Sequence, residues 1–98
     1  MREIWKSVKG YEGLYEVSTL GRVKNSRNMI LKPYDNQCGY LAIELCIDKK
    51  QKRKRLHRII AENLISNPEG YRFVKFRDEN KRNCRVDNLY WSRTADGV

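Results

Sequence analysis

Histidine and cysteine, the side chains most used in catalytic and metal sites, are scarce: the 98 residues contain one histidine, His57, and three cysteines. Cys38, Cys46 and Cys84 are odd in number and widely spaced, which argues against a disulfide framework and indicates a reducing compartment. A structural zinc site would need a fourth ligand, for which only His57 is present. No Ser-His, Cys-His or paired-carboxylate arrangement is apparent. We therefore expect no metal and no other cofactor.

Long apolar segments are lacking too. No apolar run approaches the ~18 residues of a membrane span, and the opening MREIWKSVKG has no apolar signal core. We expect a soluble protein of the cytoplasm, the host cytoplasm if phage-encoded, with no membrane partner. The 98 residues leave room for one compact unit and leave the oligomeric state open.

Acidic residues are outnumbered, because 12 Asp and Glu stand against 21 Lys and Arg and the formal net charge is +9. Residues 1–48 carry seven basic and six acidic side chains, whereas residues 49–98 carry fourteen and six. The excess in the second half indicates an anionic partner, above all nucleic acid. The alternative is a solvated basic surface without a partner.

The first half of the chain is typical of short antiparallel strands. In YLAIELCID, residues 40–48, Leu41, Ile43, Leu45 and Ile47 alternate with other side chains. A period of two places these four on the core face of a half-covered sheet. Turn-forming residues separate the shorter apolar runs before this strand. We expect residues 1–48 to form one antiparallel unit.

The second half begins with KKQKRKR, residues 49–55, which is too charged to be buried and predicts a hairpin tip and the strand leading out of it. Residues 56–65 then change to a helical period, with apolar side chains at i, i+3, i+4 and i+8. These side chains are Leu56, Ile59, Ile60 and Leu64.

A second alternation follows in YRFVKF, residues 71–76, and predicts a strand with Val74 and Phe76 on one face. Tyr71 and Phe73 lie on the other face. These aromatic side chains could stack on unpaired bases, but aromatic residues of small domains are more often core. We expect at most one of Tyr71, Phe73 and Phe76 to be exposed.

The front of the chain, EIWKSVKGYEGLYEVSTLGRVKN, resembles the DNA-binding module that precedes the nuclease domain of small phage-type HNH homing endonucleases. Several features recur at fixed offsets: a Trp-Lys pair at residues 5–6, a Gly-Tyr-Glu-Gly turn at 10–13, Tyr-x-Val-Ser at 15–18 and Gly-x-Val at 21–23. The resemblance extends over nearly the whole chain.

LHRIIAENLISNPEGY and VKFRDENKRNCRVDNLYW resemble that family's His-Arg-led helix and metal-binding hairpin. The resemblance implies an α+β fold, with a small antiparallel sheet followed at residues 49–98 by a degenerate, truncated ββα-metal (HNH-like) unit. Part of the hairpin's frame is present, and we favour a structural role for it because these residue types also form turns and fill cores. The frame consists of Asp78, Asn80, Asn83, Asn88 and Trp91.

The side chains that do the chemistry in the family differ here. The family's general-base His falls on Phe76, which cannot accept a proton, and its metal-binding Asp or Asn falls on Lys75, which repels a divalent cation. The last family ligand falls about six residues beyond Trp91, close to the end of the sequence. Loss of a positioned base alone costs about two to four orders of magnitude in rate. We therefore predict that the protein is not an enzyme and has no catalytic residues.

The first hypothesis is a catalytically inactive, HNH-derived, phage-encoded protein that binds nucleic acid, above all DNA, through phosphate contacts. A second is a protein-binding inhibitor of host defence or of host nucleic-acid machinery, and a third is a residual metal-dependent DNA endonuclease. The predicted nucleic-acid contacts are Lys49, Lys50, Lys52, Arg53, Lys54, Arg55, Arg58, Arg72, Lys75, Arg77, Lys81, Arg82 and Arg85.

Overall fold

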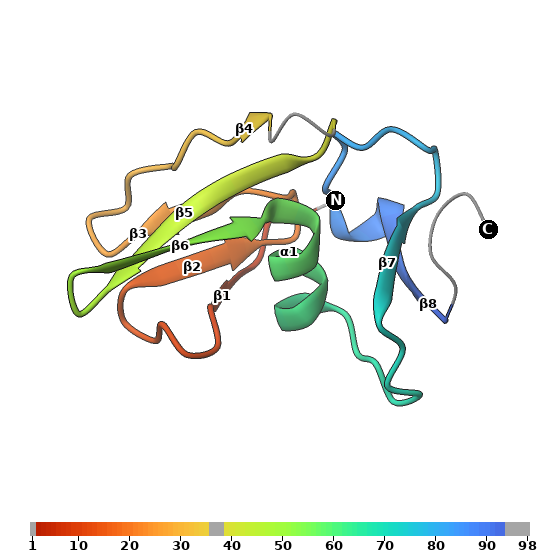
Figure 1. Cartoon of the computed structure of the whole chain (residues 1–98), viewed down its shortest axis with the longest axis horizontal. Helices are drawn as coiled ribbons and strands as arrows, with labels where there is room; N and C mark the ends of the chain where they lie inside the picture. Colours follow the sequence, from red (N-terminus) through yellow and green to blue (C-terminus); the bar gives the residue numbers. More distant parts are fainter. Residues whose placement is uncertain (1, 36–38, 94–98) are drawn as a thin grey trace.

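The computed structural model describes residues 2–35 and 39–93, and one nine-residue helix lies at the centre of its antiparallel strands (Figure 1). The presence of a helix together with separate antiparallel sheets confirms the predicted α+β class. The elements are β1 (Trp5–Ser7), β2 (Tyr15–Ser18), β3 (Val23–Asn25), β4 (Tyr34–Asp35), β5 (Leu41–Ile47), β6 (Lys50–Arg55), α1 (Leu56–Leu64), β7 (Phe73–Phe76), the 3-10 helix η1 (Val86–Asn88) and β8 (Leu89–Ser92).

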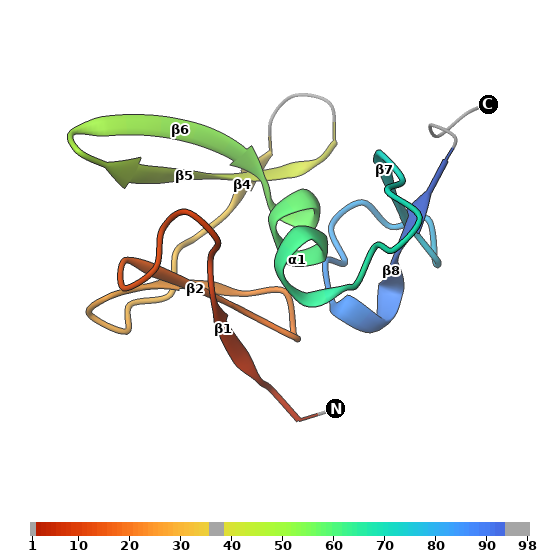
Figure 2. The same ribbon diagram turned by 90° about the horizontal axis from the view of Figure 1, so that it is seen from below.

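The strands form three small sheets, β1-β2-β3, β4-β5-β6 and β7-β8. Figure 2 shows the first two as facing layers, with α1 at the end where they approach β7 and β8. In the first sheet Val17 pairs with Val23, and both are buried against the second layer and the helix. The layers therefore enclose one apolar cluster.

The second sheet depends on a tight turn between β5 and β6. Asp48 and Lys49 both have positive φ, at 52° and 65°, as two-residue hairpin turns that match strand twist require. Ile43 and Leu45 are buried while Glu44 is exposed, as the predicted alternation requires, but Ala42 on the same face as Glu44 is buried as well. The predicted division between residues 1–48 and 49–98 lies in this turn. Strands on its two sides, β5 and β6, therefore belong to the same sheet.

Helix α1 buries the apolar stripe that its sequence predicts. Leu56, Ile59 and Ile60 are each at most 3% exposed and belong to the same core cluster as side chains of all three sheets. Asn63 is also buried, with its Nδ2 donating to the Ile59 carbonyl and its Oδ1 accepting from the Lys9 amide at 2.8 Å. Among the described residues, no helix has both the length and the apolar character that a bilayer crossing requires.

The third sheet pairs β7 with β8, and its alternation follows the prediction. Val74 and Phe76 are buried, whereas Phe73 is 39% exposed. Tyr71 is half-buried, so one of the three aromatic side chains of residues 71–76 is exposed, as predicted. The loop between the strands returns through η1, so that Leu89 lies opposite Phe76.

Two distant segments meet at the turn after β2. The Val86 amide donates to the Thr19 carbonyl at 3.0 Å. Gly21 has φ +83°, and a Cβ at this position would lie 2.7 Å from the Cys84 carbonyl oxygen. A side chain is therefore excluded both by the left-handed backbone and by the backbone of residue 84.

Gly21→Ala should destabilise the fold more than Gly13→Ala. Gly13 has φ +80° but nothing within 4 Å of its Cβ position, so its replacement tests the backbone effect alone. We expect about 1–2 kcal/mol for Gly13→Ala and about 1–3 kcal/mol more for Gly21→Ala, because its Cβ overlaps a carbonyl. Urea unfolding followed by circular dichroism measures both. Equal losses would show that the turn moves away from residue 84 at little cost.

Candidate nucleic-acid interface

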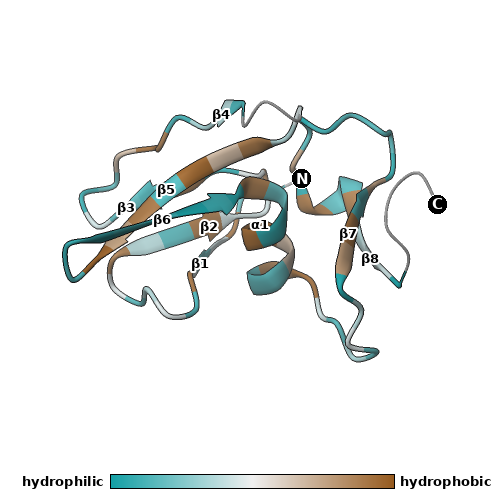
Figure 3. Ribbon diagram, in the orientation of Figure 1, coloured by the Kyte–Doolittle hydropathy of each residue, from teal (hydrophilic) through white to brown (hydrophobic). Residues whose placement is uncertain are grey.

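The basic residues predicted to contact nucleic acid fall into two groups. One group lies in a single hairpin, whose strand β6 is hydrophilic along its length beside a more apolar β5 (Figure 3). This group comprises Lys49 in the turn and Lys50, Lys52, Arg53, Lys54 and Arg55 in β6. The other group comprises Arg58 on α1, Arg72 before β7, Lys75 in β7 and Arg77, Lys81, Arg82 and Arg85 in the following loop.

The register of β6 divides its cations between two faces. Lys54 lies opposite Ile43 and therefore on the core face, whereas Arg55 lies opposite Ala42 and Arg53 opposite Glu44. Lys50 and Lys52 share the face of Lys54 at the same spacing of two. The face that carries Arg53 and Arg55 also carries Tyr34, because Tyr34 pairs with Ala42 from the other side.

Tyrosine rings underlie the cations of this outer face and of the adjoining loop. The Arg53 Cζ lies 5.8 Å from the Tyr34 ring centroid, and the Arg77 Cζ lies 5.1 Å from that of Tyr90. These distances are within the range of cation–π attraction. Tyr40 has two such neighbours, the Arg55 Cζ at 5.1 Å and the Lys81 Nζ at 4.6 Å. We call Arg53, Arg55, Arg77, Lys81, Tyr34, Tyr40 and Tyr90 the cation–tyrosine row.

The charges of the row are not neutralised locally. In the described part of the chain, none of its four cations lies within 4.0 Å of a carboxylate. Glu44, opposite Arg53, instead accepts the Tyr34 hydroxyl at 3.2 Å. The row thus presents exposed cations whose side chains rest on rings rather than on acids.

Other predicted contacts are already engaged with acidic groups. Arg58 pairs with Glu62 at 3.3 Å and Arg82 with Asp35 at 2.8 Å. The Arg85 Nε lies 3.6 Å from an Asp87 carboxylate oxygen. An anion at any of these three arginines would compete with an existing carboxylate. Their net attraction for phosphate is therefore weaker than that of the four cations in the row.

Phe76 and His57 form an aromatic cluster with Tyr40 at the start of α1. The His57 ring stacks on Tyr40 with centroids 5.0 Å apart, and the Phe76 ring lies 5.0 Å from His57. Phe76 is 6% exposed and His57 4%. The half-buried Lys75 lies opposite Tyr90 in the β7–β8 register.

Among the frame residues, the side-chain amide of Asn88 holds the loop between β7 and β8 together. The Asn88 Oδ1 accepts the Asp78 backbone amide at 3.1 Å, and its Nδ2 donates to an Asp78 carboxylate oxygen at 2.9 Å and to the Asn83 carbonyl at 2.8 Å. The Asp78 carboxylate also accepts the Asn83 side chain and the Asn80 amide. These hydrogen bonds, that from Asn83 first, lower the pKa of Asp78 below its ordinary value.

Trp91 joins the hairpin to the end of the helix. Its indole N–H donates to the Ile65 carbonyl at 3.1 Å, and the Arg58 Cζ lies 5.4 Å from its ring centroid. The side chain is half-buried at this junction. Trp91 therefore links β8 to the segment that follows α1.

The donor set of the hairpin does not fit a divalent cation. Residues 2–35 and 39–93 contain no group of three or more His, Cys, Asp or Glu side chains that could hold a metal ion. The Asp78 carboxylate is occupied by three donors of its own loop. The ligand position expected about six residues beyond Trp91 lies outside the described residues, and we derive no step through a metal.

Sequence reasoning missed the tyrosines of the row. Tyr34, Tyr40 and Tyr90 lie in segments whose composition does not set them apart, and their neighbours in space are distant in sequence. The strand register could have found Tyr34, because Tyr34 and Arg55 both lie opposite Ala42.

Comparison with known protein sequences gives three findings. Residues 3–46 match the family model described as the NUMOD4 motif. An uncharacterized HNH endonuclease of Acanthamoeba polyphaga mimivirus is 31% identical over 88 residues, which are 90% of this chain and 26% of that protein. The DNA endonuclease I-HmuI of Bacillus phage SP01 is 36% identical over 88 residues, which are 89% of this chain and 51% of that protein.

A solved structure of the HNH homing endonuclease I-HmuI, described as showing DNA binding and cleavage, has the same fold. It superimposes with a TM-score of 0.82 at 36% identity, over 91% of this chain and 52% of that one. The chain thus spans about half the length of I-HmuI and about a quarter of the mimivirus protein.

These findings contradict the prediction that the protein is not an enzyme, because the relatives are named DNA endonucleases. The prediction was wrong because it judged the whole molecule by two side chains of one hairpin. Lys75 and Phe76 exclude one arrangement of ligand and base, but they do not exclude other donors in a chain that matches endonucleases over nine-tenths of its length. No finding tests the predicted inhibitor role, which stays a prediction.

Asp78→Asn should reduce the dependence of stability on acidic pH. Because the folded-state pKa of Asp78 is lowered, its carboxylate stabilises the fold above the ordinary aspartate pKa of about 3.9, and this contribution is lost as pH falls through the lowered value. We expect the variant to be less stable than the natural protein at pH ~6 and to differ less from it at pH ~2.5. Urea midpoints at the two pH values measure this. Asp87→Asn, at an exposed neighbouring position, is the control, and the same pH profile in both variants would contradict the assignment.

Proposed function

The chain belongs to the HNH homing endonuclease family, and from this membership we propose that it binds duplex DNA through the cation–tyrosine row. The observation that carries the proposal is the absence of carboxylate partners at the row's four cations in the described residues, while the neighbouring Arg58, Arg82 and Arg85 have them. Such cations attract phosphate without first giving up an ion pair.

The arrangement of the row suits a phosphate backbone better than a single anion. Arg53 and Arg55 stand two residues apart on β6, whereas Lys81 and Arg77 belong to the loop after β7. Tyr40 lies near both Arg55 and Lys81, so it joins the two elements into one surface. Cations at several separated points can contact successive phosphates of one strand.

The rings of the row limit the entropy lost on binding. A free arginine or lysine side chain has up to about 2 kcal/mol of rotamer entropy to lose when it is fixed. A cation that already rests on a tyrosine has lost part of that freedom before DNA arrives. The tyrosines are therefore positioning residues in this proposal, and the cations are the contacts.

The proposal includes DNA cleavage, because the relative I-HmuI is named a DNA endonuclease and its solved structure is described as showing DNA cleavage. Supercoiled plasmid incubated with the protein and magnesium or manganese provides the test. Conversion to open circles above a buffer control supports the endonuclease role. Binding without conversion would limit the function of these 98 residues to holding DNA.

Arg55→Gln and Lys81→Gln should each weaken duplex binding in a salt-dependent way. If each cation neutralises one phosphate, each replacement reduces the magnitude of the negative slope of log affinity against log salt by about 0.9. Fluorescence anisotropy with a labelled duplex at several salt concentrations measures the slope. Arg85→Gln makes the same change in net charge at a residue that already has Asp87 nearby, so it should leave the slope nearly unchanged. Equal effects of Arg55→Gln and Arg85→Gln would show that only net charge matters.

A further inference from the structure

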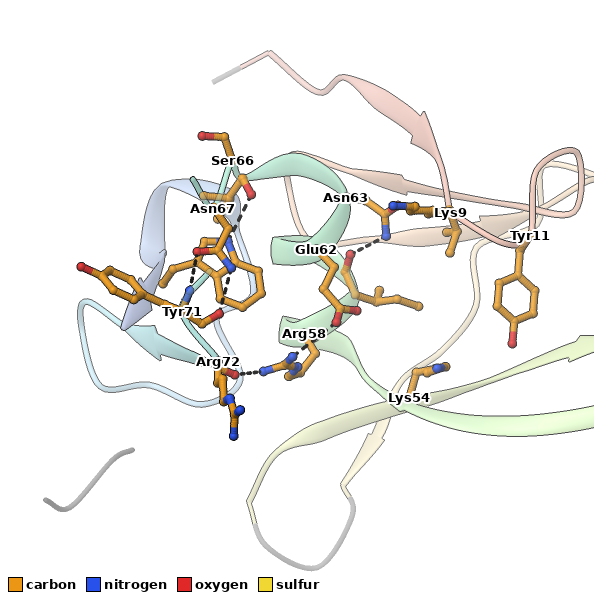
Figure 4. Close-up of a pocket in the computed structure, with 14 residues that line it drawn as sticks. Lys9, Tyr11, Lys54, Arg58, Glu62, Asn63, Ser66, Asn67, Tyr71 and Arg72 are labelled. Carbon is orange, nitrogen blue, oxygen red and sulfur yellow. Dashed lines mark hydrogen bonds and ion pairs between the residues drawn. The ribbon is translucent and has the colours of Figure 1, made fainter. Parts of the chain in front are cut away.

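A cleft of about 770 Å³ lies along α1, between the turn after β1 and the segment that leads into β7 (Figure 4). No residue of the cation–tyrosine row lines it. Its volume is within the ~300–1,000 Å³ of small-molecule sites, which suits one or two nucleotides rather than a duplex. The cleft is therefore a second site, separate from the surface proposed for duplex DNA.

Positive charge predominates around the cleft. Lys9, Lys54, Arg58 and Arg72 line it, against the single carboxylate of Glu62. That carboxylate pairs with Arg58, whose guanidinium also donates to the Arg72 carbonyl. In the described residues, Lys9, Lys54 and the Arg72 guanidinium have no carboxylate within 4.0 Å. Three cations thus remain available to an anion.

Two aromatic residues of the cleft are positioned by hydrogen bonds, Trp91 through its side chain and Tyr71 through its backbone. Trp91 is anchored by its indole N–H on the Ile65 carbonyl. The backbone of Tyr71 is bracketed by Asn67, whose Oδ1 accepts the Tyr71 amide at 2.9 Å and whose Nδ2 donates to the Tyr71 carbonyl at 2.8 Å. Both rings are half-buried, so part of each surface remains accessible.

The side-chain amides of the cleft are already used. The Asn63 amide bonds the Ile59 carbonyl and the Lys9 amide, and the Asn67 amide bonds Tyr71. Neither has its main hydrogen-bonding groups free to read the edge of a base. Charge and ring surface remain, and these recognise a nucleic acid strand without regard to sequence.

We propose that this cleft binds a single-stranded segment of nucleic acid. Phosphates contact Lys9, Lys54 and Arg72, and a base packs against Tyr71 or Trp91. Lys54 belongs to β6, so a strand in the cleft reaches the edge of the basic hairpin. The inference rests on the proposed function for the identity of the polyanion, but it concerns different residues.

The test uses a labelled oligothymidine of about ten nucleotides, a length within the range of single-strand binding sites. Lys9→Gln and Arg72→Gln should each reduce the magnitude of the negative single-strand salt slope by about 0.7 and leave the slope for duplex DNA unchanged. Lys6→Gln, at an exposed position of β1 outside the cleft, is the matched control and should change neither slope. Arg55→Gln should reduce the magnitude of the salt slope for duplex DNA and leave the single-strand slope unchanged. Failure of one site is therefore distinguishable from failure of the other.

A second readout follows Trp91 directly. Trp5→Phe leaves Trp91 as the one tryptophan, and its fluorescence should be quenched when oligothymidine enters the cleft. Adding Arg72→Gln should reduce this quenching at the same oligonucleotide concentration. Oligothymidine binding that is insensitive to both Lys9→Gln and Arg72→Gln would overturn the proposal. So would equal affinity for a polyglutamate of the same length with the same sensitivity, because the cleft would then serve acidic polypeptide segments.

Discussion

Burial of one apolar stripe on α1 holds the molecule together. Leu56, Ile59 and Ile60 contact side chains of all three sheets in one cluster, whereas no strand pairing joins one sheet to another among the described residues. The two-stranded sheet is marginally stable at best by itself in water, and the two three-stranded sheets need a covered apolar face. The positions of the three sheets relative to one another therefore depend on packing against the helix and on a few loop contacts, such as that between Gly21 and Cys84.

This constraint explains why the basic surface forms at all. Arg55 belongs to the second sheet and Lys81 to the loop of the third, and they approach the same tyrosine because both elements pack at the start of α1. The cleft has the same origin on another part of the helix, where Lys54, Arg58 and Arg72 come from β6, α1 and the approach to β7. Both surfaces are assembled by helix packing and not by any one segment of sequence.

The periodic segments could be predicted from the sequence, since their signal is local. Residues 41–47 alternate and residues 56–64 follow helical spacing, and each pattern has one structural solution. The turn at residues 10–13 was assigned only through a family resemblance. The closeness of Gly21 to Cys84 and of Tyr40 to Lys81 could not be foreseen, because each joins residues more than forty positions apart. The error about enzymatic activity had the same cause, since a local pattern was used to decide a property of the whole molecule.

Phe76 shows how a position that looks like a lost chemical group can contribute to packing. Its ring packs on His57, and His57 stacks on Tyr40, so an apolar contact chain runs from the hairpin to the ring beneath Arg55 and Lys81. A histidine at residue 76 would place a second polar ring in this buried cluster, and its desolvation would oppose the packing. The aromatic side chain therefore fixes the junction of helix and hairpin, on which the geometry of the cation–tyrosine row depends.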